Sequence, residues 1–336
     1  MSDLGGLRRI GPFEVPPLGL GCMNLSHAYG EKPSEEAAER LLRAAVDAGV
    51  RLFDTAALYG FGANEELLGR VLAPHRDEIV LASKCGMTGV DGRRVIDGRP
   101  ETLLRTADEA LARLRTDVID LYYLHRVDRA VPVEESIGAL AQLVEAGKVR
   151  AIGLSEVSAE TLHRAHAVHP VAAVQNEYSL WSRNPELGTL EAARELGVAL
   201  VAFSPLARGV LTSAPPDLAG LPEKDIRRNM PRFSEENYPA NLALREHLVG
   251  IARASGVTLA QLALAWVLSR GEHVVAIPGT RSPDHLRENV AALGVHVSDR
   301  ALQAAGRVLN AGTVHGARYV PETLAEIDTE AYADAG

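Results

Sequence analysis

The chain has 336 residues, of which 46% are hydrophobic and 24% are charged, and these proportions exclude a disordered or fibrous protein. Its formal net charge of −9 argues against a nucleic acid or an anionic membrane as a partner. Two cysteines, Cys22 and Cys85, are too few for a secreted disulfide scaffold and no apolar run is long enough for a membrane span, so we expect a cytoplasmic protein.

The chain begins with a predicted hairpin and then alternates short apolar runs with amphipathic stretches. The hairpin comprises residues 7–10 and 13–15, joined by a turn at Gly11-Pro12. The apolar runs predict strands at 18–23, 51–55, 78–85, 118–125, 149–155, 172–178, 198–205 and 274–278. The amphipathic stretches predict helices at 34–48, 64–72, 100–114, 133–146, 159–169 and 187–196, within 242–270, and at 283–293. Ser34 is the expected N-cap of the first helix, and Pro100 suits the first position of the third.

Eight β/α units of this kind predict an α/β protein with a (β/α)8 barrel preceded by a short hairpin. Such a barrel needs about 250 residues, which leaves length for loops and a tail. An open doubly wound sheet is the alternative, but no G-x-G-x-x-G stands between a strand and a helix. We expect one barrel domain over residues 1–336, with an irregular loop near 207–239. The tail, 311–336, either covers the barrel mouth or is disordered. The loop at 87–98 carries no readable pattern.

Polar residues close most of the predicted strands. The carboxyl ends of barrel strands carry the active site in this architecture, so Asp54, Lys84 and His125 on three successive strands would converge on one opening. Each residue alone also has a plain structural interpretation, as a cap, a solvated lysine or a packed histidine. Tyr59 lies in the loop after the Asp54 strand. A nearby lysine ammonium lowers the pKa of a phenol, which makes Tyr59 a candidate general acid.

With these residues the chain resembles the aldo-keto reductase family. The matching segments occur in order, about one per β/α unit, which makes the resemblance highly specific. They run from the first barrel strand to the last helix, and are Leu18-Gly-Leu-Gly-Cys-Met23, Leu52-Phe-Asp-Thr-Ala56, Tyr59-Gly60, Ser83-Lys84, Asp120-Leu-Tyr-Tyr-Leu-His125, Ile152-Gly-Leu-Ser155, Val174-Gln-Asn-Glu-Tyr178, Phe203-Ser-Pro-Leu206, Ile277-Pro-Gly-Thr280 and Glu288-Asn289.

The resemblance implies an NADPH-dependent reduction of a small aldehyde or ketone, with four catalytic residues. Tyr59 would donate a proton to the carbonyl oxygen as hydride arrives from the nicotinamide. Lys84 would depress the pKa of Tyr59, and Asp54 would hold Lys84 in place. His125 would hydrogen-bond and orient the carbonyl oxygen.

The resemblance also implies the contacts of the NADP(H) nicotinamide. Ser155 and Gln175 would hold the carboxamide, while Phe203 would lie against the ring. Gly21 and Met23, at the end of the first barrel strand, would border the same ring.

The rest of the cofactor would follow the last two β/α units. The residues implied along the pyrophosphate are Ser204, Leu206, Arg208 and Gly209. The residues implied around the last helix are Gly279, Thr280, Arg281, Glu288 and Asn289. A helix N-terminus with an adjacent arginine favours a phosphate, and therefore NADP over NAD. Two positions depart from the family pattern, because Glu156 stands where many members have asparagine and His285 where many have arginine.

Two other functions remain open on sequence grounds. Lys84 would form a Schiff base with a carbonyl substrate in a barrel lyase or aldolase. The second alternative is a regulatory protein that binds a nicotinamide cofactor but turns over no substrate. No metal site is expected, because the recurring histidines of 163–169 drift around a helix and lack a carboxylate partner. Three large side chains follow strand ends and either line a substrate pocket or pack against the rim, namely Tyr29, Met87 and Trp181.

Overall fold

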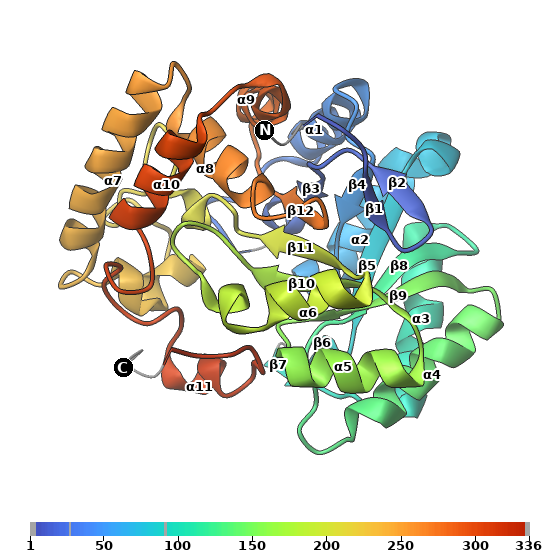
Figure 1. The fold of residues 1–336 in the computed structure, drawn as a ribbon. Helices are drawn as coiled ribbons and strands as arrows, with labels where there is room; N and C mark the ends of the chain where they lie inside the picture. Colours follow the sequence, from blue (N-terminus) through green and yellow to red (C-terminus); the bar gives the residue numbers. More distant parts are fainter. Residues whose placement is uncertain (1–4, 27, 91–92, 333–336) are drawn as a thin grey trace.

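The computed structural model describes residues 5–26, 28–90 and 93–332, and shows a parallel sheet wrapped into a barrel inside a ring of helices (Figure 1). The strands pair in the order β3-β4-β5-β8-β9-β10-β11-β12. Their bounds are β3 (Leu20–Gly21), β4 (Leu52–Asp54), β5 (Val80–Cys85), β8 (Ile119–Leu124), β9 (Val149–Ser155), β10 (Val171–Glu177), β11 (Ala199–Phe203) and β12 (Val274–Ile277). The predicted (β/α)8 fold is confirmed.

The barrel closes between its first and last strands. Leu18 forms a parallel bridge with Ala276, beside the ends of β3 and β12. The Gly19 amide donates to the Ala276 carbonyl at 2.9 Å, and the Ala276 amide donates to the Pro17 carbonyl at 2.9 Å. The alternative of an open doubly wound sheet is therefore wrong.

Helices cover the outside of the barrel, and most lie within a few residues of their predicted bounds. They are α1 (Glu35–Asp47), α2 (Ala63–Leu72), α3 (Pro100–Leu114), α4 (Val133–Glu145), α5 (Ala159–Val168), α6 (Thr189–Leu196), α7 (Tyr238–Ala254), α8 (Leu259–Leu268), α9 (Pro283–Ala291), α10 (Asp299–Val308) and α11 (Pro321–Leu324). Ser34 caps α1 by accepting from the Ala37 amide at 3.3 Å, and α3 begins at Pro100 as predicted. α10 was not predicted, and it packs beside α7 at one edge of the molecule (Figure 1).

Short 3-10 turns link several of these elements. They are η1 (Met23–Leu25), η2 (Tyr59–Gly62), η3 (Ala73–Glu78), η4 (Asn184–Leu187), η5 (Ala207–Gly209), η6 (Ile226–Asn229), η7 (Pro231–Phe233) and η8 (Ala292–Gly294). Three of them, η5 to η7, give local structure to the loop near 207–239. Within the described residues no single helix is long and apolar enough to span a membrane, and α7 with α8 meets that test only as a pair bent by 88°.

The predicted N-terminal hairpin, β1 (Arg8–Ile10) and β2 (Phe13–Val15), closes the end of the barrel at which the strands begin. Ile10 and Val15 are fully buried in the apolar cluster that fills the inside of the barrel. Gly11 turns the hairpin at a φ of +52°, and a Cβ there would lie 2.7 Å from the Cβ of Ala172. The turn therefore requires glycine for both its conformation and its close approach to the barrel.

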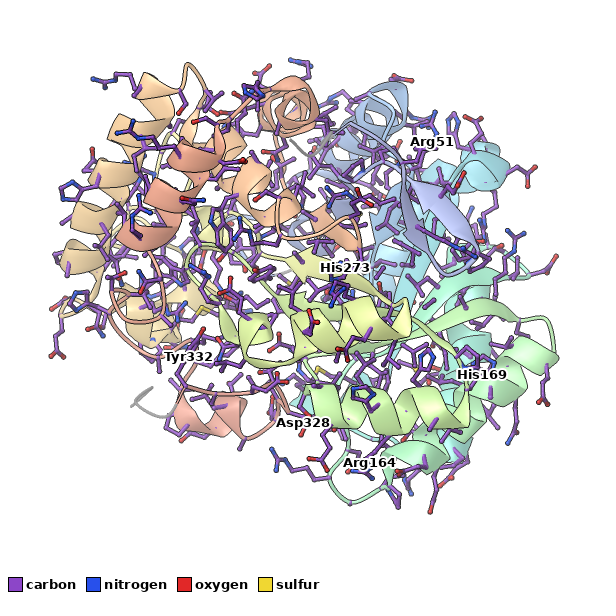
Figure 2. The ribbon with its side chains drawn as sticks, in the orientation of Figure 1. Arg51, Arg164, His169, His273, Asp328 and Tyr332 are labelled. Carbon is purple, nitrogen blue, oxygen red and sulfur yellow. The ribbon has the colours of Figure 1, made fainter. Side chains whose placement is uncertain are left out.

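A second hairpin and the tail lie at the opposite end. The loop at 87–98 contains β6 (Met87–Val90) paired with β7 (Arg93–Ile96), which the sequence pattern did not predict. The described part of the tail is ordered along the outer ends of α5 and α6, where Figure 2 shows Asp328 and Tyr332. Asp328 accepts from the Ser158 hydroxyl at 3.0 Å, and the Tyr332 hydroxyl donates to the Arg183 carbonyl at 3.1 Å. Arg318 of the tail also contacts Glu156 and Glu177 at the carboxyl ends of β9 and β10, and coverage of the mouth by the tail stays a prediction.

Candidate active site

The period of two in the strands explains why polar side chains meet inside the barrel mouth. Inward-facing apolar residues fill the barrel interior along each strand. Asp54 lies two residues beyond the inward-facing Leu52, and Lys84 lies two beyond Ala82. The same phase brings inward the residues predicted at the ends of the neighbouring strands, namely His125, Ser155, Gln175 and Phe203.

Lys84 joins two of the other predicted catalytic groups. Its ammonium forms an ion pair with Asp54 and donates to the Thr55 carbonyl at 2.8 Å. It also donates to the Tyr59 hydroxyl oxygen at 3.2 Å. These three contacts use the three N–H groups of a lysine ammonium, so Lys84 is held in one geometry although its side chain is fully buried.

His125 completes the cluster from the neighbouring strand. Its ring meets the ring of Tyr59 edge to face, with centroids 5.9 Å apart. Burial lowers the pKa of His125 well below its ordinary value, and the positive charges of Arg126 and Lys84 lower it further. The imidazole is therefore neutral at pH 7. Its Nδ1 is buried with no partner among the described residues.

The pKa of Tyr59 differs from the sequence expectation. Burial raises the pKa of this phenol, and the Lys84 ammonium only partly offsets that rise, so the pKa lies above its ordinary value. The expectation that Lys84 brings the phenol toward neutral pH is wrong for the overall direction. The expectation is correct that the Lys84 charge by itself lowers the pKa of Tyr59. Tyr59 consequently keeps its proton across the neutral range.

The residues predicted for the nicotinamide lie next to this cluster. Gln175 donates from its amide to Asp54 at 2.7 Å, so it also braces the carboxylate that pairs with Lys84. The Ser155 hydroxyl accepts from Arg126 at 3.3 Å. Phe203, at the end of β11, is partly exposed, as are Gly21 and Met23 at the end of β3. Their contacts with a cofactor stay predictions.

Glu156, the first departure from the family pattern, lies in a buried ionic network with the tail. Its carboxylate accepts from the Arg318 guanidinium at 2.8 Å and from the Glu177 amide at 2.8 Å. Its φ of +56° is left-handed, a strained conformation for a residue other than glycine. The network therefore holds the turn that directly follows Ser155.

Arg208, predicted along the pyrophosphate, belongs to the same network. Its guanidinium pairs with Glu177 at 2.7 Å and donates to the hydroxyl oxygens of Tyr29 at 2.7 Å and Tyr319 at 2.5 Å. Arg208 is buried, with 8% of its surface exposed. Burial raises the pKa of Glu177, but Arg208 and Arg318 outweigh this effect and hold it well below its usual range. The pyrophosphate contact of Arg208 stays a prediction.

The loop that carries Arg208 has an unusual backbone. Ser204 and Arg208 both adopt left-handed conformations, with φ of 50° and 55°, and Gly209 has a φ of 96°. Leu206 lies between them and is largely buried. Gly209 is followed by the right-handed Val210, and adjacent residues of opposite hand direct their backbone N–H groups toward one side, a geometry that suits an anion.

The last unit places the predicted phosphate residues at the start of α9. Thr280 and Arg281 precede the N-cap Ser282, and Gly279 is exposed. The Arg281 guanidinium donates to the Glu31 carbonyl, which links α9 to the loop before α1. Glu288 and Asn289 follow within the helix. A helix N-terminus with an adjacent guanidinium is a suitable site for a phosphate.

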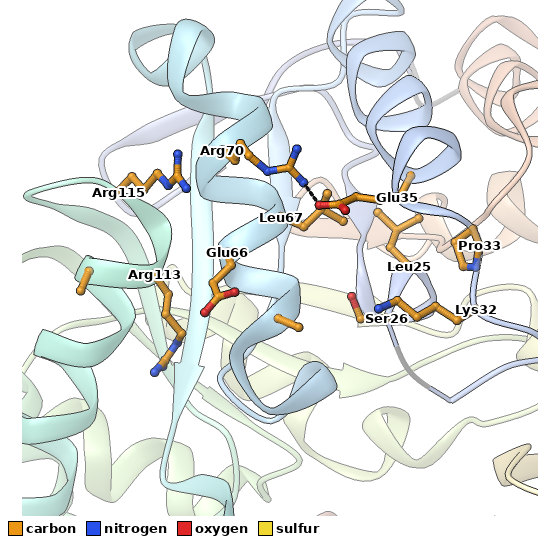
Figure 3. Close-up of a pocket in the computed structure, with 13 residues that line it drawn as sticks. Leu25, Ser26, Lys32, Pro33, Glu35, Glu66, Leu67, Arg70, Arg113 and Arg115 are labelled. Atoms are coloured by element: carbon orange, nitrogen blue, oxygen red, sulfur yellow. Dashed lines mark hydrogen bonds and ion pairs between the residues drawn. The ribbon is translucent and has the colours of Figure 1, made fainter.

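A cavity of about 650 Å³ lies outside the barrel (Figure 3). It is enclosed by α2, by α3, and by the start of α1 with the loop that precedes it. Its wall includes Lys32, Glu66 and Arg115, and none of the predicted site residues lines it. The Arg70–Glu35 ion pair closes part of its rim. This cavity is therefore separate from the predicted site at the strand ends.

Two of the three large side chains that follow strand ends pack into the protein. Trp181 is 1% exposed and lies against Phe233 with ring centroids 5.7 Å apart, while the Arg232 guanidinium covers it. Met87 is also buried. The burial of Trp181 and Met87 therefore favours packing against the barrel rim over a role in lining a substrate pocket.

Three residues of the site were not singled out from the sequence. Glu177 follows Gln175 by two, so strand phase could have indicated it, whereas Arg126 directly follows His125 beyond the end of β8 and has no such signal. Arg318 lies in the tail, where no periodic pattern marks it. Only the folded structure brings it within reach of residues far earlier in the chain.

The comparisons with known proteins agree with this geometry. A family model described as the aldo/keto reductase family matches residues 17–308. The chain is 43% identical over 321 residues to the aldo-keto reductase yakc of Schizosaccharomyces pombe, whose name specifies NADP(+), covering 94% of each chain. It is 43% identical over 310 residues to the probable aldo-keto reductase 1 of Glycine max, covering 91% of this chain and 89% of the other. Among solved structures, it is similar to a glycerol dehydrogenase from Gluconobacter oxydans, with a TM-score of 0.83 and 29% identity over 92% of this chain and 95% of the other. It is also similar to an aldo-keto reductase from Klebsiella pneumoniae in complex with NADPH, with a TM-score of 0.71 and 27% identity over 92% of this chain and 96% of the other. The chain therefore belongs to the aldo/keto reductase family.

Proposed function

We propose that this protein reduces an aldehyde or a ketone to an alcohol with NADPH, and that Tyr59 is the proton donor. The observation that carries the proposal is the buried Lys84 ammonium, which joins Asp54 and the Tyr59 hydroxyl at the barrel mouth. A protonated phenol beside a fixed cation can transfer its proton to an oxygen that gains negative charge.

The strand ends support an NADP(H) site. β9, β10, β11 and β12 are consecutive neighbours, so the predicted contacts form one arc from Ser155 to the start of α9. The arc ends at the exposed Arg281, which matches a phosphate, and the name of the Schizosaccharomyces pombe relative supports the same cofactor. The bound cofactor supplies the hydride. The residues that would hold it are Gly21, Met23, Ser155, Gln175, Phe203, Ser204, Leu206, Arg208, Gly209, Gly279, Thr280, Arg281, Glu288 and Asn289.

The four catalytic groups divide the work at the carbonyl oxygen. Tyr59 donates the proton, while Lys84 stabilises the phenolate that remains. Asp54 fixes Lys84 through the ion pair. His125, a neutral imidazole, donates a hydrogen bond that orients the carbonyl.

The Schiff-base alternative is disfavoured by the state of Lys84. An amine attacks a carbonyl only when it is unprotonated. Burial lowers the pKa of Lys84, but Asp54 and Tyr59 outweigh it and keep the pKa above its ordinary value. Its three N–H groups are also already engaged.

A panel of aldehydes and ketones, followed by NADPH absorbance with NADH as the control, tests the proposal. Consumption of NADPH that depends on both enzyme and carbonyl supports it. Tight NADPH binding without turnover of any carbonyl would favour the regulatory alternative. A borohydride-trapped adduct on Lys84 would favour the lyase.

The reduction should be nearly independent of pH across the neutral range. The pKa of Tyr59 is raised above its ordinary value of about 10, and that of His125 is lowered well below about 6.5. No proton therefore leaves or joins these groups between about pH 6.5 and 9.5. We expect kcat/KM for reduction to fall only above this window, and alcohol oxidation, which needs the phenolate, to rise there. A steep fall in the rate of reduction between pH 7 and 9 would contradict the assignment.

Replacement of Arg281 by alanine should weaken the preference for NADPH. Loss of a charge-assisted contact with a phosphate is expected to raise the KM for NADPH by about tenfold and to leave the KM for NADH nearly unchanged. Arg287→Ala is the matched control, because Arg287 lies in α9, the helix that follows Arg281, is exposed and pairs with Asp284. Equal effects of Arg281→Ala on both cofactors would contradict a phosphate contact.

The setting of the activity is also a proposal. Cys22 and Cys85 are buried and unpaired, which supports a reducing, cytoplasmic compartment. The net charge of −9 supports small-molecule partners rather than nucleic acid or membrane. We propose that residues 1–336 act as one barrel domain.

A further inference from the structure

Arg126 is a cation at the barrel mouth that has no counter-ion among the described residues. One of its terminal nitrogens donates to the His125 carbonyl at 2.6 Å and to the Ser155 hydroxyl at 3.3 Å. No carboxylate within the described ranges forms an ion pair with it, and the side chain is partly buried. Its other two nitrogens form no hydrogen bond with the described residues and are accessible to solvent.

Neighbouring arginines at this end of the barrel are already engaged. Arg94 pairs with Glu326 of the tail. Arg129 donates to the tail carbonyls of Ala325 at 3.0 Å and Ile327 at 3.2 Å. The tail therefore binds both of these arginines, whereas no ion pair within the described residues compensates the charge of Arg126.

Arg126 also acts on the groups that would meet the substrate. Burial raises the pKa of Tyr59, and Arg126 is one of the charges that lower it. Burial and then Arg126 lower the pKa of His125. Both effects require the guanidinium to lie within electrostatic reach of the two groups proposed to contact the carbonyl oxygen.

We propose that Arg126 binds an anionic substituent, a carboxylate or a phosphate, on the aldehyde or ketone that this protein reduces. The inference rests on the proposed carbonyl reduction and adds the charge of the substrate. The free donors of the guanidinium match the oxygens of either group. A partly desolvated cation gains stabilisation when a ligand supplies its counter-charge.

The contact with Ser155 adds a positional argument. Arginine can only donate, so the Ser155 hydroxyl oxygen accepts and its own proton remains free. Arg126 thereby leaves Ser155 as a hydrogen-bond donor beside its own two accessible nitrogens. An anion held there would lie beside the tetrad rather than at the outer rim.

Matched substrates test the proposal. We would measure kcat/KM with NADPH for 4-carboxybenzaldehyde against its methyl ester, and for glyceraldehyde 3-phosphate against glyceraldehyde. A preference for the anionic member of about tenfold or more is expected in at least one pair, and the pair that shows it distinguishes carboxylate from phosphate. The preference should largely disappear in Arg126→Met and persist in Arg129→Met, which removes a charge from the same loop. Neutral substrates favoured in both pairs, or an anion preference unchanged in Arg126→Met, would overturn the proposal.

A binding measurement separates this inference from the proposed function. Calorimetric titration of the protein saturated with NADP(+) compares benzoate with benzamide and inorganic phosphate with sulfamide, in the parent and in Arg126→Met. Anion binding that depends on Arg126, without turnover of any aldehyde, would support the inference and contradict carbonyl reduction. Turnover of aldehydes with no dependence of anion binding or preference on Arg126 would leave carbonyl reduction in place and overturn the inference.

Discussion

Replacement of Tyr59 by phenylalanine is expected to lower the rate of carbonyl reduction by about 10²- to 10⁴-fold, because the reaction loses its positioned proton donor. The ring and its edge-to-face contact with His125 remain, so the shape of the mouth is retained. NADPH binding, measured by fluorescence titration, should change little. The measurement that decides is kcat at saturating NADPH with the best aldehyde of the panel.

Tyr122→Phe is the matched control for this experiment. Tyr122 is a buried tyrosine of β8, but it packs in the cluster between the strands and the helices rather than inside the barrel. Loss of its hydroxyl should leave the rate of reduction within a few-fold of the parent. A Tyr59→Phe enzyme as active as the parent on every aldehyde would exclude Tyr59 as the donor.

Replacement of Arg318 by methionine is expected to destabilise the folded protein by about 3–5 kcal/mol. Arg318 is 7% exposed and pairs with Glu156 at 2.8 Å and with Glu177 at 3.1 Å. Its loss leaves the buried Glu156 carboxylate with no cation, and such a charge costs more than the intact pair contributes. Thermal unfolding followed by circular dichroism should show a clear fall in the melting temperature.

Two further variants separate the loss of counter-charge from a general loosening of the tail. Arg94→Met breaks the Arg94–Glu326 pair, whose side chains are 41% and 31% exposed, and should cost no more than about 1 kcal/mol. Arg318→Met combined with Glu156→Gln removes a cation and an anion together and should be less destabilising than Arg318→Met alone. Equal melting temperatures for Arg318→Met and the parent would show that the network contributes no net stability.

The barrel was predictable because its strands and helices each carry a local signal. α3 begins at Pro100, and β9 has the predicted bounds Val149–Ser155, since proline at a first turn and an apolar run are both legible in sequence. The hairpin of β6 and β7 was not predicted. Residues 88–94, which are mostly polar or glycine, lack the alternation that marks a strand with one buried face.

The candidate site was predictable only in part, for the same reason. Asp54, Lys84 and His125 end apolar runs, and the barrel geometry alone implies that they converge. The role of Arg318 depends on a contact with Glu156 across 162 positions of sequence, and no local pattern encodes such a distance. The overall direction of the Tyr59 pKa could not be predicted, because the Lys84 charge is visible in sequence, whereas the extent of burial is not.

The β1–β2 hairpin and the tail lie at opposite ends of the barrel, and the residues that they cover differ in polarity. The β1–β2 hairpin covers apolar residues inside the barrel, and its Arg8 donates to the Leu268 carbonyl at 2.9 Å. The tail covers charged groups instead, through Arg318 and the other members of the network. Loss of the hairpin would therefore expose an apolar surface and favour aggregation, whereas loss of the tail would leave the buried Glu156 carboxylate without its cation and lower the stability of the fold. The two losses should thus be distinguished by solubility and by melting temperature before any assay of activity.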